Sequence, residues 1–357
     1  MIPKSIEDVT NTWLSEILRG EVWISKRIQI GQGVGIMGDI FRIELSHKES
    51  GIPHSLVVKL PSSWEENRSQ GVALGMFEAE VKFYRELAQE VTAGLPRIFL
   101  AEIESGTSNF IILMEDLSYL TMVNQSQGAT VDQALMAVEV LAAVHSVWWD
   151  KVSNEQLSWI PDMIGPRIQF VDDLLEQILK PFCDTFGDYL APEGKEMFEA
   201  FAGNYLSVNR TLAQRSPWTL AHQDFRVENM LFDENRVVVL DWQGIGRGPG
   251  SYDLAYFLGG SMETELRRAN ERFIVSHYHA KLVEEGITGY SLDQLWSDYQ
   301  LGHLQGGLAT SMVTGGSMDL SNERGRQLIA TMSNRHVTAA LDHNGMSLLE
   351  DCVNRCN

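Results

Sequence analysis

Three polar side chains in the second half of the chain have the types and spacing that phosphoryl transfer requires. Asp224 follows His222 in the segment TLAHQDFRVENMLF, and Asn229 comes five residues after Asp224. The β-branched run 237–240 then ends at Asp241, twelve residues after Asn229. A carboxylate such as Asp224 can orient an acceptor hydroxyl and take its proton, while the oxygens of Asn229 and Asp241 suit Mg²⁺. Asp and Asn also cap turns without any chemistry, so the interpretation needs support from elsewhere in the chain.

A glycine-rich turn near the N-terminus gives part of that support. Residues 31–38 read GQGVGIMG, so Gly33, Gly35 and Gly38 form the pattern G-x-G-x-x-G of a kinase glycine-rich loop. Glycines there let backbone N–H groups close over phosphates with no Cβ in the way. A glycine-rich hairpin gives the same letters. A dinucleotide-binding turn would open a helix, whereas the following DIFRIEL alternates like a strand.

A lysine among apolar residues is the second support. Lys59 lies in the strand-like run SLVVKL, where an ammonium needs an anion unless it reaches solvent. In a kinase-like site that anion is the α/β-phosphate pair, and a helix glutamate fixes the lysine. The helical pattern 77–87 offers Glu80 for this role, with Glu78 as the second candidate.

The elements expected around these residues form two lobes. Residues 5–18 predict a helix capped by Ser5, and residues 61–72 predict a mobile polar loop. The expected strands are 22–30, 39–45, 55–60, 96–104 and 109–114. The last strand ends at Glu115, and backbone groups near Glu115 and Leu117 are expected to bind the adenine edge. We therefore expect a nucleotide-binding lobe over 1–115, a hinge over 116–120 and a catalytic and acceptor-binding lobe over 121–357.

The second half of the chain is mostly helical in its patterns. Helices are expected over 130–149, 162–190, 193–214, 263–285, 291–304 and 321–343. His145 is expected to be a core histidine rather than a base. The predicted fold is α+β and bilobal, of the protein-kinase-like kind, with a five-stranded antiparallel sheet plus a helix in the small lobe.

Composition narrows the class of protein. The 357 residues carry a formal net charge of −20, which argues against a nucleic-acid partner. Three scattered cysteines indicate a reducing compartment and no disulfide framework. Because we find neither a leader nor a run of eighteen apolar residues, we expect a cytoplasmic protein with no membrane partner.

With these motifs in hand, the chain resembles the aminoglycoside phosphotransferase and choline kinase superfamily. Within it, the chain is most similar to the ecdysteroid kinase-like branch and its bacterial relatives. The resemblance rests on GQGVGIMGDIFRIEL, SLVVKLP, FEAEVKFYREL, ILMEDL, AAVHSVWWD, HQDFRVENMLF and VVVLDWQGIGRGPGSYDLAYFLGGSM, which span nearly the whole chain. It implies ATP and Mg²⁺ as cofactors.

The resemblance also implies a role for each site residue. Lys59 would hold the α/β-phosphates and Glu80 would hold Lys59. Asp224 would be the catalytic aspartate, with Asn229 and Asp241 as the Mg²⁺ ligands.

Three further positions are read from the same motifs. Asp253 would be the structural aspartate that ties the following helix to the catalytic loop. Arg226 would stabilise the transition state, although a surface arginine explains it nearly as well. Gln223 departs from the glycine that most relatives carry, but protein kinases and choline kinases also tolerate a side chain there.

The acceptor is expected to be a small hydroxylated molecule and not a protein. Only twelve residues separate Asp241 from Asp253, too few for a segment on which a peptide would dock. A partly apolar alcohol (sterol-like, terpenoid or hydroxyacyl) is the first expectation, with a pocket drawn from Trp296, Tyr299, Met312, Met318 and Met332, although each of these more simply fills the core. An aminoglycoside or choline-type amino-alcohol is the alternative, and it would need carboxylates such as Glu263, Glu265, Asp319 and Glu323. A nucleotide-binding scaffold without turnover is the second alternative.

Overall fold

The chain forms two compact units, which are described separately. The computed structural model describes residues 2–31, 38–92, 94–317 and 323–356. The first unit is Met1–Thr121 together with Val238–Gly244, and the second is Met122–Val237 together with Ile245–Asn357. The segment 238–244, which the sequence assigns to the second lobe, therefore packs within the first unit. The predicted α+β class is confirmed, with a five-stranded antiparallel sheet first and a larger helical part after it.

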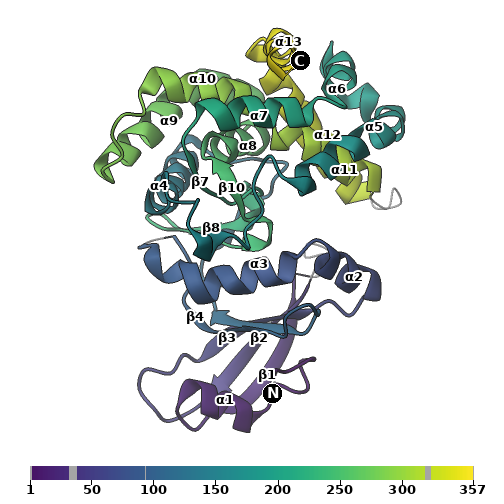
Figure 1. The fold of residues 1–357 in the computed structure, drawn as a ribbon. Helices are drawn as coiled ribbons and strands as arrows, with labels where there is room; N and C mark the ends of the chain where they lie inside the picture. The colour runs from purple at the N-terminus through teal and green to yellow at the C-terminus, as the bar shows by residue number, and fades with distance from the viewer. Residues whose placement is uncertain (1, 32–37, 93, 318–322, 357) are drawn as a thin grey trace. The chain divides into compact units, whose positions relative to one another are not determined.

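The sheet of the first unit has every predicted strand, with ends within two residues of those expected. Its strands are β1 (Trp23–Ile30), β2 (Gly38–Ser46), β3 (Ser55–Pro61), β4 (Ile98–Ile103) and β5 (Phe110–Glu115). Their order is β1-β2-β3-β5-β4, and neighbouring strands are antiparallel (Figure 1).

The two-residue period of β3 decides where its lysine points. Leu56, Val58 and Leu60 belong to an apolar core that the helix α1 (Asn11–Leu18) covers. Since side chains alternate between the faces of a strand, Lys59 faces the other way, toward the helix α3 (Met76–Lys82). Helices α1 and α3 lie on opposite sides of the sheet (Figure 1).

Two expectations for the first unit are wrong. Helix α1 begins at Asn11 and not at Ser5, because Asp8 accepts hydrogen bonds from the N–H groups of Lys4 and Ser5, which closes a turn ahead of the Thr10 cap. Residues 61–72 do not form a loop, because the helix α2 (Glu65–Ala73) occupies most of them. It has no apolar stripe for a sequence pattern to detect.

The end of the predicted helix 77–87 is also irregular. After α3 the chain continues as a π-helical turn over Phe83–Leu87 and a 3₁₀ turn over Ala88–Glu90. Phe77, on α3, stacks on Phe110 of β5 with ring centroids 4.8 Å apart, which fixes α3 on the sheet.

The second unit is built from helices around an apolar core. Its helices are α4 (Val131–Val147), α5 (Pro166–Phe186), α6 (Gly194–Phe201), α7 (Tyr205–Arg215), α8 (Ser251–Ser261), α9 (Thr264–Glu284), α10 (Leu292–Gly302), α11 (Gly306–Ser317), α12 (Glu323–Asp342) and α13 (Gly345–Cys356). Strand β7 (Trp218–Ala221) pairs antiparallel with β10 (Gly246–Pro249). The short strands β6 (Thr121–Met122), β8 (Met230–Phe232) and β9 (Val237–Val239) complete the chain.

The structure corrects the predicted helices at three places. Residues 193–214 form two helices, because Gly203 takes a left-handed φ of 77° between α6 and α7. Helix α11 escapes prediction because four of its twelve residues are glycine. Helix α13 follows the last predicted helix and is held in place because its Leu349 and Cys352 are buried in the core.

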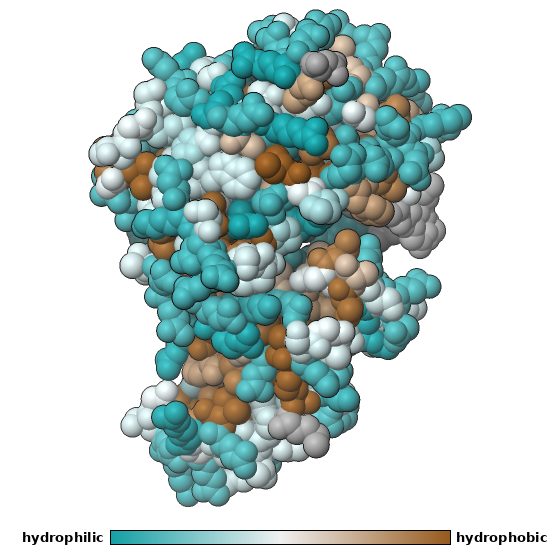
Figure 2. All heavy atoms as spheres, viewed as in Figure 1, coloured by the Kyte–Doolittle hydropathy of each residue, from teal (hydrophilic) through white to brown (hydrophobic). Residues whose placement is uncertain are grey.

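The outer face of the molecule is mainly hydrophilic in the view of Figure 2, with apolar side chains in scattered groups. Among the residues that the structure describes, no helix is both long enough and apolar enough to cross a membrane.

The burial of one histidine leads us to expect a lower free energy of unfolding in mild acid. His336 is 2% exposed, and burial, with Arg335 second, lowers its pKa to about 3. Because the unfolded chain binds a proton below about pH 6.5 and the folded one does not, the free energy of unfolding should fall as pH drops from 6.5 toward 3. The contribution of His336 to this fall in the free energy of unfolding approaches about 1.4 kcal/mol per pH unit. We expect His336→Gln to have a shallower slope in urea unfolding between pH 7 and pH 5; equal slopes would contradict the assignment.

Candidate active site

In the first unit, one buried ammonium group holds two carboxylates. Lys59 Nζ lies 2.9 and 2.7 Å from the two oxygens of Glu80 and 3.0 Å from Asp241 Oδ1. Lys59 is 9% exposed and Glu80 only 2%. The glutamate that the helical pattern favours is thus the one in contact with the lysine, while Glu78 lies beside Ser105.

Charge in this triad is unbalanced, which fits a divalent cation. Burial opposes the charge on Lys59, but Asp241 and Glu80 more than offset this and raise its pKa. Burial raises the pKa of Glu80, against the pull of Lys59. Two carboxylates face one ammonium group, so negative charge remains on hard oxygen atoms of the kind that Mg²⁺ prefers.

The segment that carries Asp241 is fixed by a ring stack and strained at one residue. Trp242 stacks on Phe83 with centroids 3.9 Å apart and planes 9° apart, and Val239 N donates to Gly94 O. Asp241 itself takes a left-handed φ of 67°. Such backbone is uncommon for a residue with a side chain, although Asp adopts it more readily than most, and it is enriched at functional sites.

In the second unit, several donors orient Asp224. Its Oδ1 accepts a hydrogen bond from Tyr256 OH at 3.0 Å, and its Oδ2 accepts one from Asn229 Nδ2 at 2.8 Å. Arg226 Nε lies 3.3 Å from the same carboxylate. Because Asn229 also donates from Nδ2 to the backbone oxygen of Asp224 at 2.9 Å, its amide oxygen is the atom suited to a cation.

The loop that carries Asp224 is tied to α8 by a buried carboxylate. Asp253 is fully buried and accepts hydrogen bonds from the N–H groups of His222 at 2.6 Å and Gln223 at 2.9 Å. His145 Nε2 lies 3.2 Å from the same carboxylate, and its Nδ1 lies 2.7 Å from Tyr278 OH. His145 is therefore a satisfied core histidine, as expected.

The other expected site residues fall in different surroundings. Arg226 lies between Asp224 and Glu228, and these carboxylates raise its pKa although burial opposes this. Gly38 packs where a Cβ would come within 2.9 Å of the Leu60 carbonyl oxygen. Gly33 and Gly35 lie outside the described residues.

The residues expected to bind the edge of adenine, Glu115 and Leu117, lie at the end of β5 and two residues after it. Glu115 N donates to Arg97 O, its side chain accepts from Arg97 N, and the Leu117 carbonyl accepts from Leu120 N. The roles of Glu115 and Leu117 remain predictions, as do those of the other expected site residues. The expected metal ligands, Asn229 and Asp241, are divided between the two units.

Sequence reasoning missed Tyr256, although a signal for it was present. Tyr256 stands three residues after Asp253, and residues three apart share a face of a helix. The helix that presents Asp253 to the loop of Asp224 therefore presents Tyr256 to the same loop. Burial, and then Asp224, raise the pKa of Tyr256, so its hydroxyl keeps the proton that it donates.

Tyr256→Phe should therefore lower kcat by about 10- to 100-fold and leave both KM values nearly unchanged, because hydrogen bonds to charged groups contribute about 1.5–3 kcal/mol. Steady-state kinetics would measure this. Tyr252→Phe is the matched control, since the Tyr252 ring stacks on Tyr256 but its hydroxyl forms a hydrogen bond with Tyr205. An unchanged kcat in Tyr256→Phe would contradict the positioning role.

The residues proposed for an acceptor pocket are mostly used elsewhere. Tyr299 and Met312 are fully buried, so the core interpretation holds for both, and Met318 and Asp319 lie outside the described residues. The carboxylates expected for a cationic acceptor already have partners: Glu263 caps α9, Glu265 pairs with Arg268 and Glu323 pairs with Arg326.

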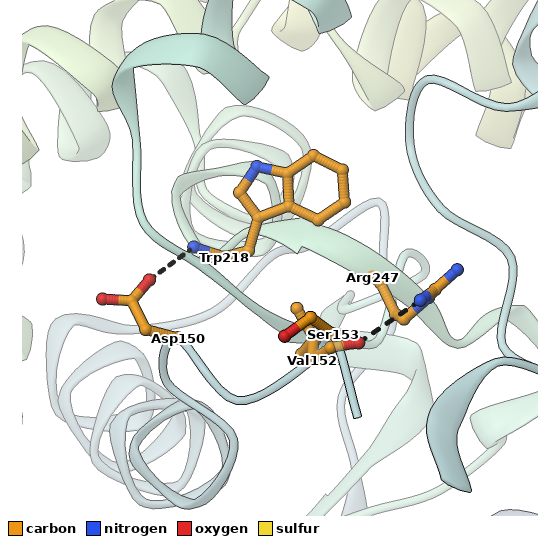
Figure 3. A pocket seen from close by; sticks show the side chains of 5 residues that line it. All are labelled: Asp150, Val152, Ser153, Trp218 and Arg247. Atoms are coloured by element: carbon orange, nitrogen blue, oxygen red, sulfur yellow. Dashed lines mark hydrogen bonds between the residues drawn. The ribbon is translucent and has the colours of Figure 1, made fainter. Parts of the chain in front are cut away.

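One cavity of the second unit lies under β7 and β10. It has a volume of about 270 Å³ and is lined by Asp150, Val152, Ser153, Trp218 and Arg247 (Figure 3). Asp150 accepts from Trp218 N, and Arg247 donates to the carbonyl oxygens of Ile160 and Val152. Because these polar groups bond one another, we regard the cavity as structural.

A buried cluster of metal-ligand types also has a structural explanation. Glu271, His303 and His343 each offer one possible ligand atom, and these three atoms lie within 4.8 Å of one another. Arg267 Nη1 donates to Glu271 Oε2 at 2.5 Å, and Tyr299 OH donates to the same oxygen at 2.9 Å. The guanidinium group at this oxygen opposes a cation there.

Comparisons with known proteins place the chain among small-molecule kinases. A sequence profile described as the ecdysteroid kinase-like family matches residues 32–287. No curated protein sequence matches the chain significantly.

Solved structures share the fold at low identity. A choline kinase from Cryptosporidium parvum is 10% identical with a TM-score of 0.60, over 92% of this chain and 91% of that one. An ethanolamine kinase from Plasmodium vivax is 11% identical with a TM-score of 0.52, over 88% and 81%. A macrolide 2′-phosphotransferase from Brachybacterium faecium is 16% identical with a TM-score of 0.50, over 91% and 98%.

Proposed function

Because the chain belongs to the ecdysteroid kinase-like family, we propose that it transfers the γ-phosphate of ATP, with Mg²⁺, to a hydroxyl of a small, partly apolar alcohol. The chain is a phosphotransferase with an alcohol group as acceptor. The nucleotide, the metal and the acceptor class are the parts that we propose.

The observation that carries this proposal is the orientation of Asp224. Tyr256, Asn229 and Arg226 hold its carboxylate from three sides, and the two hydrogen bonds from Gln223 and His222 to Asp253 hold its loop. A scaffold that only binds nucleotide needs no such constraint on a carboxylate. The arrangement therefore favours the enzyme over the scaffold.

The residues suit an in-line transfer. Asp224 orients the acceptor hydroxyl and takes its proton as the new P–O bond forms and the bond to the departing ADP oxygen breaks. Lys59, held by Glu80, binds the α/β-phosphates. Asn229 and Asp241 would hold Mg²⁺, which would supply positive charge for the phosphate oxygens.

The acceptor side favours an alcohol with apolar surface. A choline-type or aminoglycoside acceptor would need free carboxylates, and three of the four candidates are engaged in a cap or an ion pair. The amino-alcohol remains the second candidate acceptor.

Coupled ADP release with a panel of hydroxylated compounds tests this function. The panel should contain sterols, terpenoid alcohols, hydroxyacyl compounds, amino-alcohols and aminoglycosides, each with and without Mg²⁺. We expect a phosphate ester, identified by mass spectrometry, from an apolar alcohol only when Mg²⁺ is present. Binding of Mg-ATP by calorimetry without an ester from any alcohol would instead support the scaffold.

A further inference from the structure

One half-buried arginine of the second unit is held by an amide oxygen and not by a carboxylate. Arg167 lies in the first turn of α5 and donates from Nη2 to Gln223 Oε1 at 2.6 Å. Among the described residues, no carboxylate lies within ion-pairing distance of Arg167. Burial lowers the pKa of Arg167, since its charge is only partly compensated. Tyr205, Tyr252 and then Asp162 act to raise its pKa, and Asp162 is itself 3.6 Å from Arg247.

The partner of Arg167 is itself incompletely satisfied. Gln223 Nε2 is buried and has no hydrogen-bond partner among the described residues. A buried donor without an acceptor is uncommon and costs about 1–3 kcal/mol. Gln223 also takes a left-handed φ of 67°, so this loop accepts backbone strain to place its side chain beside Arg167.

A glycine lets the Gln223 amide pack directly against β10. A Cβ on Gly246 would lie 1.8 Å from Gln223 Nε2 and 3.4 Å from Arg167 Nη2. Gly246 pairs with Ala221 at the edge where β10 and β7 lead into the catalytic loop. The guanidinium and amide donors therefore converge next to the segment that carries Asp224.

Nearby features suit a molecule with an acidic group and an apolar body. Phe170, one turn after Arg167, is 61% exposed. Residues three apart share a helix face, so an aromatic ring and an uncompensated cation stand side by side on α5.

We propose that Arg167 and Gln223 bind the carboxylate of the acceptor, which is therefore an amphipathic hydroxy acid. This inference rests on the proposed function and narrows its acceptor class. A planar guanidinium fork and an amide N–H group match the geometry of a carboxylate. The terminal phosphate of the nucleotide is another oxyanion with the same chemistry, and the kinetics below separate the two sources.

The test uses matched acids and amides with the full-length protein. Hydroxylated carboxylic acids, from 3-hydroxydecanoate to hydroxylated bile acids, are each compared with their primary amide in calorimetric titrations and in the ADP-release assay. For the wild type we expect the acid to be favoured about 10- to 100-fold in affinity and in kcat/KM, as for a charged hydrogen-bonded pair. In Arg167→Gln this preference should disappear, while KM for ATP stays unchanged.

Arg210→Gln is the matched control, because Arg210 is exposed on α7 and the change in charge is the same. It should keep the wild-type preference. Arg167→Lys should restore part of it, since lysine keeps the charge but not the fork.

The outcomes that would overturn the inference are distinct from those that affect the kinase proposal. Equal binding of acids and amides by the wild type would overturn it, as would a preference that survives in Arg167→Gln. A raised KM for ATP with an unchanged acceptor KM would assign Arg167 to the nucleotide instead. Turnover of neutral alcohols by both proteins would leave the kinase proposal standing, whereas acid binding with no ester from any alcohol would contradict only the kinase proposal.

Discussion

Asp224→Asn should lower kcat by about 10²–10⁴-fold while Mg-ATP still binds. The amide keeps the shape of the carboxylate and can still meet Tyr256, but it cannot take the acceptor proton, and general-base catalysis contributes an effect of this size. The rate of ester formation and a calorimetric titration with Mg-ATP measure the two quantities separately.

Asp233→Asn is the control for this variant. Asp233 is exposed in the turn between β8 and β9, where its side chain accepts a hydrogen bond from Asn235 N. It should behave as the wild type. Near-normal turnover in Asp224→Asn would remove Asp224 from the catalytic role and, with it, the mechanism proposed above.

Lys59→Met should unfold more easily and lose activity. The change leaves Glu80, which is 2% exposed, without its ammonium partner, and breaking a buried ion pair costs about 3–5 kcal/mol. Burial raises the pKa of Glu80, so in the folded variant this side chain is protonated and neutral at low pH. As pH rises it must ionise without a partner, and the free energy of unfolding of the variant falls. Urea unfolding should therefore show a larger defect near pH 8 than near pH 6.

A double variant separates stability from function. Lys59→Met with Glu80→Gln removes both charges and should recover most of the lost free energy of unfolding. It should not recover activity, because no cation is left for the α/β-phosphates. Equal free energies of unfolding for the single and double variants would contradict this, because they would show that the loss of Lys59 leaves no destabilising charge on Glu80.

The contact between Lys59 and Glu80 was predictable because two local periods determine it. Strand alternation turns Lys59 to one face of β3, and the helical stripe of α3 places Glu80 beside the residues that meet that face. The five strands were predictable for the same reason. The proximity of Asp224 and Asn229 was likewise predictable, because both residues belong to one short loop.

Other features depend on packing between distant segments, which no local period records. The approach of Arg167 to Gln223 joins residues 56 positions apart, and a sequence motif gives no sign of it. Helix α11 forms despite its glycines because Gly306 and Gly307 let it approach Tyr252 and His336 closely. Helix α2 has almost no buried surface, so hydrophobic patterning could not find it.

The route of the backbone has a consequence for any attempt to dissect the protein. Because residues 238–244 leave the second unit and return to it, the covalent chain joins the units three times, at 121–122, 237–238 and 244–245. A fragment cut after residue 121 would lack Asp241 and would strip Phe83 of the indole ring that covers it. The first unit therefore cannot be inherited, exchanged between relatives or expressed as one contiguous cassette, since its last structural element is encoded more than a hundred residues downstream.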